Sequence, residues 1–300
     1  MRNRPRTGIA PPMAPRMASG FSRRFAHWLG ISFGICLALT SAPAPAGTGC
    51  HQRAPEPEEL RAAVQLGHAV RETLDSLDAE VAVVARVGQD LSPWGLRYSH
   101  AGFAWRDHPA GRWQVVHLLN ECGTDRSALY VEGMANFFTD VVRHEASIVV
   151  PPAAVGRRLA GLLSSGDANR LHEPRYSMLA YVFSTRYQNS NQWLLEVYAA
   201  AAQGDGDLDR NTAQRWLKTR GFAPITVEVP AWKRLGGRLF RANIAFDDHP
   251  FGRRMAGQID TTTVDSIVRF LERRGEVSSS AEVFLPGAEA GPRMDSATNK

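Results

Sequence analysis

The sequence predicts a single α+β or α/β domain, because segments with strand patterns alternate with segments with helical patterns along most of the chain. The clearest strand signal is a β-branched run at 81–87, and the clearest early helix signal is the apolar spacing at 58–76. A turn rich in Asp, Pro and Gly at 107–111 joins two further strand-like segments. With 44% hydrophobic and 22% charged residues in a chain of 300, the composition is that of an ordinary globular protein.

In the first half of the chain, the helix expected at 58–76 has apolar residues every three or four positions, from Leu60 to Leu77. The β-branched residues of 81–87 indicate a buried strand. Further along, Pro151 and Pro152 precede a new helical pattern. The remaining predictions here are strands at 97–105, 113–119 and 146–150, and helices at 129–138 and 153–163.

In the second half, the strongest helical pattern covers 190–202 and ends at Gly204, which begins an Asp- and Gly-rich stretch. From Ser278 onward, the chain offers little apolar surface to bury, so we expect 276–300 to be a disordered tail. The other predictions are strands at 177–183, 225–229 and 239–246, and helices at 212–219 and 263–273.

The formal net charge of +5 comes from the start of the chain. Residues 1–46 hold six arginines and no Asp, Glu or Lys, which leaves 29 basic and 30 acidic residues in the rest, a net charge of −1. Two arginines, an apolar run at 28–39 and the Ala-Pro-Ala sequence ending at Ala46 are typical of a signal peptide, with an uncleaved anchor as the alternative. We therefore expect signal cleavage near Ala46 and a periplasmic or secreted domain at 47–275.

The nearly neutral remainder excludes a basic surface for nucleic acid, and no second apolar stretch is long enough to span a bilayer. Once the leader is removed, Cys50 and Cys122 remain, and an oxidising compartment favours a disulfide between them. A catalytic thiol at Cys122 is the alternative. Lipid attachment at Cys50 is disfavoured because 47–49 lacks a large aliphatic residue.

A histidine on a strand is the first candidate for chemistry. His100 shares a strand face with Gly102, and small neighbours leave room for another group to approach the imidazole. If the turn at 107–111 closes a hairpin, His117 or Asn120 on the next strand can hydrogen-bond the ring and fix its tautomer. The simpler interpretation is a histidine satisfied within the core.

A serine at a helix start is the second candidate. Ser190 opens the helix predicted at 190–202, where unpaired backbone N–H groups and the helix dipole would favour a nucleophile. The simpler interpretation is an N-cap serine, with Asn189 and Asn191 as competing caps.

Two stretches of the chain resemble each other, because 101–112 and 242–253 share seven of twelve residues and each contains Asp-His-Pro. Convergent turn chemistry explains this, since Asp and Pro favour turns. The alternative is a shared metal site with four ligands, Asp107, His108, Asp248 and His249.

The stretches Ser-His-Ala-Gly-Phe at 99–103, Val-Val-His-Leu at 115–118 and Asn-Ser-Asn-Gln-Trp-Leu-Leu-Glu at 189–196 together resemble the circularly permuted branch of the papain-like NlpC/P60 superfamily. The resemblance covers about 80–200 and implies an α+β fold with an antiparallel sheet packed against helices. The whole mature chain also resembles an exported bacterial family of unknown function, through Arg-Tyr-Ser-His-Ala-Gly-Phe, Tyr-Gln-Asn-Ser-Asn-Gln-Trp and Phe-Asp-Asp-His-Pro.

The NlpC/P60 resemblance implies that His100 is the general base, His117 the residue that orients it, and Ser190 the nucleophile. Ser190 stands where that superfamily has cysteine, and a serine hydroxyl must lose its proton during the attack. The expected functions are therefore an amide or ester hydrolase or acyltransferase acting on cell-wall peptide without a cofactor, or an inactive binding or envelope-assembly module. The expected substrate-binding residues are Tyr98, Asn120, Asn189, Asn191 and Gln192.

Overall fold

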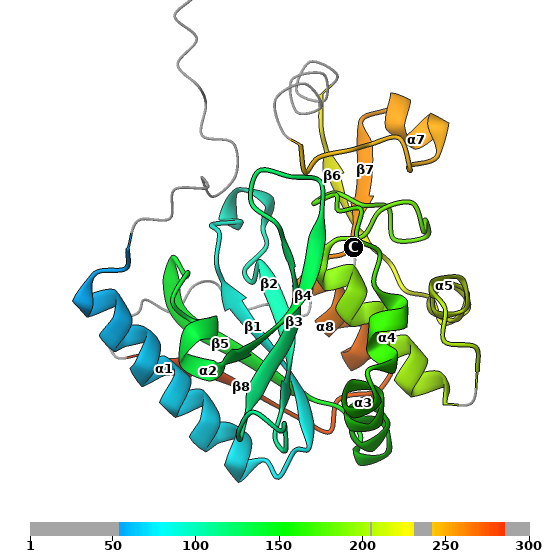
Figure 1. Ribbon diagram of the computed structural model, residues 1–300. Helices are drawn as coiled ribbons and strands as arrows, with labels where there is room; N and C mark the ends of the chain where they lie inside the picture. Colours follow the sequence, from blue (N-terminus) through cyan, green and yellow to red (C-terminus); the bar gives the residue numbers. More distant parts are fainter. Residues whose placement is uncertain (1–53, 205, 231–241, 286–300) are drawn as a thin grey trace, which may run out of the picture. The chain divides into compact units, whose positions relative to one another are not determined.

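Six strands form one antiparallel sheet in the order β4-β3-β2-β1-β5-β8, and two more form a separate hairpin sheet. The computed structural model describes residues 54–204, 206–230 and 242–285, so the predicted signal peptide lies outside the described residues. The predicted α+β class with an antiparallel sheet against helices is confirmed (Figure 1). The large sheet contains β1 (Val81–Val87), β2 (His100–Trp105), β3 (Gln114–Asn120), β4 (Ser127–Gly133), β5 (Arg143–Val150) and β8 (Ser279–Phe284), and the small one β6 (Ile225–Glu228) and β7 (Gln258–Thr261).

Helices cover both faces of the large sheet (Figure 1). One face packs against α1 and α2, and the other packs against a larger group of helices that includes α4. The helices are α1 (Pro57–Ser76), α2 (Met134–Phe137), α3 (Ala153–Ser165), α4 (Ser190–Gln203), α5 (Arg210–Thr219), α7 (Phe251–Met255) and α8 (Val264–Arg273), with 3₁₀ turns η1 (Ser92–Trp94) and η2 (Asp167–Leu171).

The central strand and the central helix explain this layering. All seven residues of β1 are buried, as expected for a strand with helices on both faces. In α4, every residue from Ser190 to Ala199 is buried, because the helix lies between the sheet and the outer helices. The Trp193 ring packs edge-on against Phe103 of β2, with ring centroids 5.8 Å apart.

Three local predictions are wrong in whole or in part. Residues 129–138 were expected to form a helix, but β4 pairs with all seven residues of β3 and only a single turn, α2, follows it. Residues 177–183 form turns and no strand, and they are held by contacts to the 243–248 segment. Of the strand expected at 239–246, residues 239–241 lie outside the described residues and 242–246 are not a strand.

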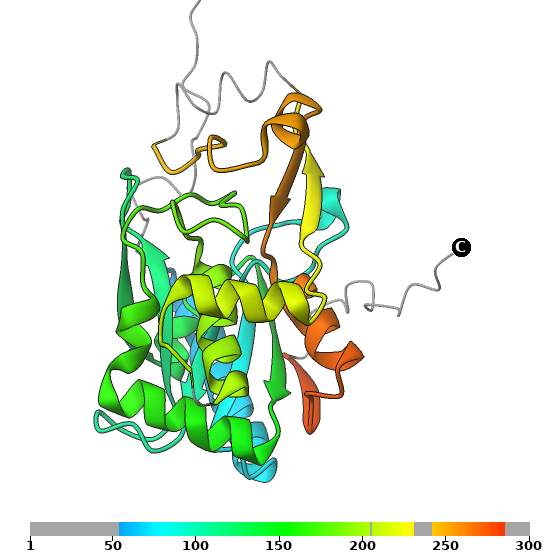
Figure 2. The ribbon, with the colours of Figure 1, turned by 90° about the vertical axis from the view of Figure 1, so that its right-hand side faces the viewer.

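The expected disordered tail is also wrong in part, since 279–284 form β8 at the edge of the sheet (Figure 2). Glu282 of β8 accepts hydrogen bonds from Arg97 at 3.0 Å and from the Tyr98 hydroxyl at 3.1 Å. Arg97 also pairs with the buried Glu145 at 2.7 Å. This group of charges fixes a strand that has little apolar surface of its own. Residues 286–300 lie outside the described residues.

Within the described part of the chain, none of the helices has the length and apolar character needed to cross a membrane.

Candidate functional site

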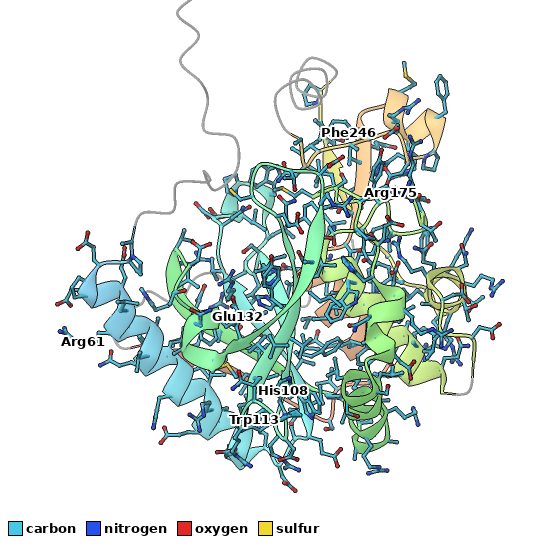
Figure 3. All side chains as sticks on the ribbon, viewed as in Figure 1. Arg61, His108, Trp113, Glu132, Arg175 and Phe246 are labelled. Atoms are coloured by element: carbon cyan, nitrogen blue, oxygen red, sulfur yellow. The ribbon has the colours of Figure 1, made fainter. Side chains whose placement is uncertain are left out.

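Four polar side chains form a row across β1, β2, β3 and β4, on the sheet face that α1 and α2 cover; we call this the buried row. Its members are Arg86, His100, His117 and Glu132, of which Glu132 is labelled in Figure 3. The Nε2 atom of His100 lies 2.8 Å from Nδ1 of His117. The Nε2 atom of His117 lies 3.3 Å from Oε2 of Glu132, at ion-pair distance but not in a well-aligned hydrogen bond. The structure thus brings His100 and His117 together.

The register of β2 and β3 explains why the two imidazoles meet. Phe103 pairs with Val116, so Gly102 faces His117 across the two strands. A Cβ atom at Gly102 would lie 3.0 Å from Cβ of His117 and 2.6 Å from Cγ1 of Val115. The absent side chain therefore lets the His117 ring reach diagonally to His100.

Burial and the charges around the row favour the neutral form of His100. Burial, and then the Arg86 guanidinium and His117, lower the pKa of His100 well below its ordinary value. Arg86 donates a hydrogen bond to the Phe137 carbonyl at 2.5 Å, and its guanidinium carbon lies 4.9 Å from the centre of the Phe137 ring. The neighbouring His117 side chain is the largest cause of the lowered pKa of Glu132. The row thus combines a fixed cation, an ionised carboxylate and two histidines.

Ser190 is not part of this row. It opens α4, and the Asn189 side chain caps the helix by accepting from the Gln192 backbone N–H at 2.7 Å. Burial raises the pKa of Tyr176, and hydrogen bonding to Ser190 partly offsets that rise. The Ser190 side chain therefore lies against the Tyr176 hydroxyl.

The expected contact between Ser190 and His100 is not formed: no hydrogen bond joins these two described residues. The reason is the alternation of side chains along β2. Phe103 faces α4, whereas His100 faces the opposite side and lies 5.9 Å from the Phe137 ring of α2, between ring centroids. The sheet therefore separates the imidazole from the helix that begins with Ser190.

Four of the five expected substrate-binding residues hold the fold together. Tyr98 is fully buried and bonds Glu282, and Asn120 closes the β3–β4 turn by donating to the carbonyls of Thr124 and Arg126. Asn189 caps α4, and Gln192 is fully buried with its Nε2 atom 3.2 Å from Oε1 of Glu196.

Asn191 differs from these four. Its Nδ2 atom donates to the Ser99 carbonyl at 3.2 Å, which fixes the orientation of the amide. Its Oδ1 atom is buried and has no hydrogen-bond partner among the described residues.

Glu196 of α4 is a buried carboxylate that sequence reasoning missed. It has no exposed surface and accepts hydrogen bonds from four side chains at 2.6–3.2 Å. The spacing of four between Gln192 and Glu196 on one helix face is the only sequence signal of this network. The Glu196 carboxylate links the segment before α4 to α5. Its donors are Gln188, Gln192, Arg210 and Gln214.

The two Asp-His-Pro stretches do not share a metal ion, so that alternative is wrong. His108 accepts from the Ala110 backbone N–H at 3.0 Å. His249 bonds Asp248 at 2.9 Å through Nδ1, and its Nε2 atom accepts from the Asp260 backbone N–H at 3.1 Å. Across the ranges that the structure describes, no group of three or more His, Cys, Asp or Glu side chains is placed to hold a metal. Each stretch is a separate turn.

Cys122 lies in the β3–β4 turn and is disulfide-bonded. Cys50 lies outside the described residues, so the Cys50–Cys122 pairing stays a prediction.

A family model described as "Uncharacterized protein conserved in bacteria (DUF2145)" matches residues 73–271. The matched part runs from the last turn of α1 into α8 and contains the whole buried row and Ser190. It supports the resemblance to a bacterial family of unknown function. No curated protein and no solved structure matches the chain, and the resemblance to NlpC/P60 stays a prediction.

Proposed function

Because the chain belongs to this family of uncharacterized bacterial proteins, we propose, from its own geometry, that it is an exported binding module on a papain-like scaffold. On this proposal it binds cell-wall peptide or a related envelope component and does not hydrolyse it. The observation that carries the proposal is the side of the sheet on which His100 lies, away from α4 and Ser190.

The papain-like part of the proposal rests on the order of the elements. A strand that begins with His100, a neighbouring strand with His117 and a later helix that begins with Ser190 follow the order of the NlpC/P60 resemblance. The hydrogen bond between His100 and His117 matches the base and orienting residue that the resemblance implies.

Electrostatics and position both disfavour hydrolysis by Ser190. A serine nucleophile needs a base that accepts its proton and carries a positive charge during the attack. The pKa of His100 is held down by burial and by the Arg86 cation, which both disfavour the imidazolium. Because His100 also lies away from Ser190, the base is wrong in both position and charge.

A second candidate function is an amide or ester hydrolase. The chain of groups from Glu132 through His117 to His100 favours it, because a carboxylate behind a histidine commonly orients a catalytic base.

One experiment distinguishes the binding module from the hydrolase. The exported chain is incubated with purified peptidoglycan sacculi and with a panel of ester and peptide substrates. The variant Ser190→Ala and the control Ser164→Ala, at an exposed position of α3, are treated in the same way. We expect the chain to sediment with the sacculi and all three proteins to leave the substrates intact. Turnover that Ser190→Ala abolishes and Ser164→Ala retains would instead establish the hydrolase, and failure to sediment would refute the binding module.

A further inference from the structure

The N-terminal turns of α4 and α8 meet in the interior of the protein. Asn189, the cap of α4, donates through Nδ2 to Oγ1 of Thr261 at 3.0 Å and to the Thr262 carbonyl at 3.3 Å, just before α8. These links hold the cap of the 14-residue α4 against the segment that leads into the 10-residue α8.

Both helix starts also contact the segment that leads into β2. Asn191 of α4 donates to the Ser99 carbonyl at 3.2 Å. The carboxylate of Asp265, in the first turn of α8, accepts a backbone hydrogen bond from Arg97. Three segments that are distant in sequence, 97–99, 189–191 and 262–265, are therefore joined by hydrogen bonds in one region.

Three polar atoms in this region have no hydrogen-bond partner among the described residues: Oδ1 of Asn191, Oγ1 of Thr262 and Oδ2 of Asp265. Their residues are 8%, 2% and 5% exposed. Buried polar atoms are nearly always bonded, and leaving one unpaired costs about 1–3 kcal/mol. Three such atoms, on segments that contact one another, indicate that the protein binds a ligand group in this region.

The chemistry of the three atoms defines that group. The Asn191 amide nitrogen is already used, so only its oxygen is open. Burial raises the pKa of Asp265, and a bound cation would stabilise its ionised form, which can only accept. The Thr262 hydroxyl can accept as well. Neighbouring cations do not fill the need, because Arg97 is paired with Glu145 and Glu282, and Arg269 is exposed. The missing partner must bring several donors and a positive charge.

We propose that this region binds a primary ammonium group, such as the free amino end of a peptide, between Asn191 and Asp265. An ammonium has three donors and no acceptor, so it can satisfy Asn191, Thr262 and Asp265 together. The ligand class rests on the proposed binding function, since it names the part of the bound peptide that the protein recognises.

The probes are alanyl-alanine amide and its N-acetyl derivative, which differ in the free amine alone. Each is titrated into the 15N-labelled exported chain while the side-chain amide signals of Asn191 are followed by NMR. We expect saturable shifts with the free amine, and binding about tenfold weaker or more after acetylation, because hydrogen bonds to a charged group are lost. Equal shifts from both peptides, or none from either, would overturn the proposal.

The variant Asp265→Asn is expected to weaken amine binding by a similar factor. Its control is Asp209→Asn, which alters a carboxylate at the start of α5 that is already bonded to Thr212. Unchanged affinity in Asp265→Asn refutes the site, as does a crystal structure with the amine present that shows a water alone between Asn191 and Asp265. The acetylation comparison uses the unmodified chain, so it decides the question even if Asp265→Asn does not fold. Sacculus sedimentation without amine binding would refute the ligand class and leave the binding module standing.

Discussion

The Nε2 atom of His100 and the Nδ1 atom of His117 are 2.8 Å apart in the interior of the sheet. At this distance, one nitrogen carries the proton and the other accepts it, so the pair holds one proton between its two facing atoms. If both facing nitrogens were protonated, two N–H groups would point at each other. This contact is thus stable only while at least one imidazole is neutral.

Acidification is therefore expected to destabilise the fold through His100. The pKa of His100 in the folded protein lies below its ordinary value of 6.5. Below pH 6.5, the unfolded chain therefore binds a proton at His100 that the folded protein does not bind. The contribution of neutral His100 to the free energy of unfolding is fully present above pH 6.5. It is lost as the pH falls from 6.5 toward the pKa of His100 in the folded protein. One such group changes the unfolding free energy by at most about 1.4 kcal/mol per pH unit.

Urea unfolding at a series of pH values checks this. His100→Gln should show a shallower loss of stability on acidification than the unmodified chain, whereas His68→Gln, at an exposed histidine of α1, should show the same loss. Equal slopes for His100→Gln and the unmodified chain would contradict the assignment.

Gly102→Ala is expected to lower stability by about 1–3 kcal/mol, because the new Cβ would lie too close to Val115 and His117 in a packed core. The matched control is Gly161→Ala on α3, where no atom lies within 4 Å of the new Cβ. There we expect a gain of about 0.5–1 kcal/mol from the better helix former. The measurement is the urea midpoint at constant slope, and a neutral Gly102→Ala would contradict the register described for β2 and β3.

Glu196→Leu is expected to cost about 3–5 kcal/mol, because it leaves the buried Arg210 without its counter-charge. The double variant Glu196→Leu, Arg210→Met should recover part of this loss. Recovery is incomplete because Arg210 also donates to the carbonyls of Ser184, Thr185 and Tyr187. As a control, Glu58→Gln in the exposed pair with Arg61 should change stability by less than about 1 kcal/mol. Chemical denaturation of these proteins and of the single variant Arg210→Met measures the coupling between Glu196 and Arg210, and additive losses would argue against it.

Ser190→Cys provides a chemical test of the geometry. The pH profile of its alkylation by iodoacetamide should be the same with and without His100→Gln, because the imidazole faces the other side of the sheet. The unmodified chain, in which Cys122 is disulfide-bonded, gives the background. A shift of the profile toward higher pH on removing His100 would show that the two side chains interact.

Local sequence patterns predicted the elements that are buried along most of their length. The strand 81–87 has the predicted bounds, and the helix at 190–202 is one residue longer than expected. The β4 strand was mistaken for a helix because pairing with β3, and not local spacing, decides its conformation. Likewise, β8 has little apolar surface, and the sequence gives no sign that Glu282 will meet Arg97 and Tyr98.

In the candidate site, too, local patterns predicted some contacts, and tertiary packing decided the others. The meeting of His100 and His117 was predictable because a short turn joins their strands, so hairpin geometry places them near each other. The expected pairing with Ser190 failed because it depends on which face of the sheet receives α4, and that is decided by tertiary packing. Asp265 and Thr262 were missed because nothing local marks a helix start as facing another one.

The position of β8 also bears on the order in which the chain can assemble. Strands β1 to β4 are consecutive neighbours and can pair as soon as residue 133 is available, and β5 can then join β1. The sheet is complete only when 279–284 arrives, after all the helices between β5 and β8. Until then, Glu145 and Arg97 lack their third partner. Closure of the far edge thus joins residues 184 and 185 positions apart in sequence, and a chain shortened before Glu282 would lack the contacts to Tyr98 and Arg97 that fix it.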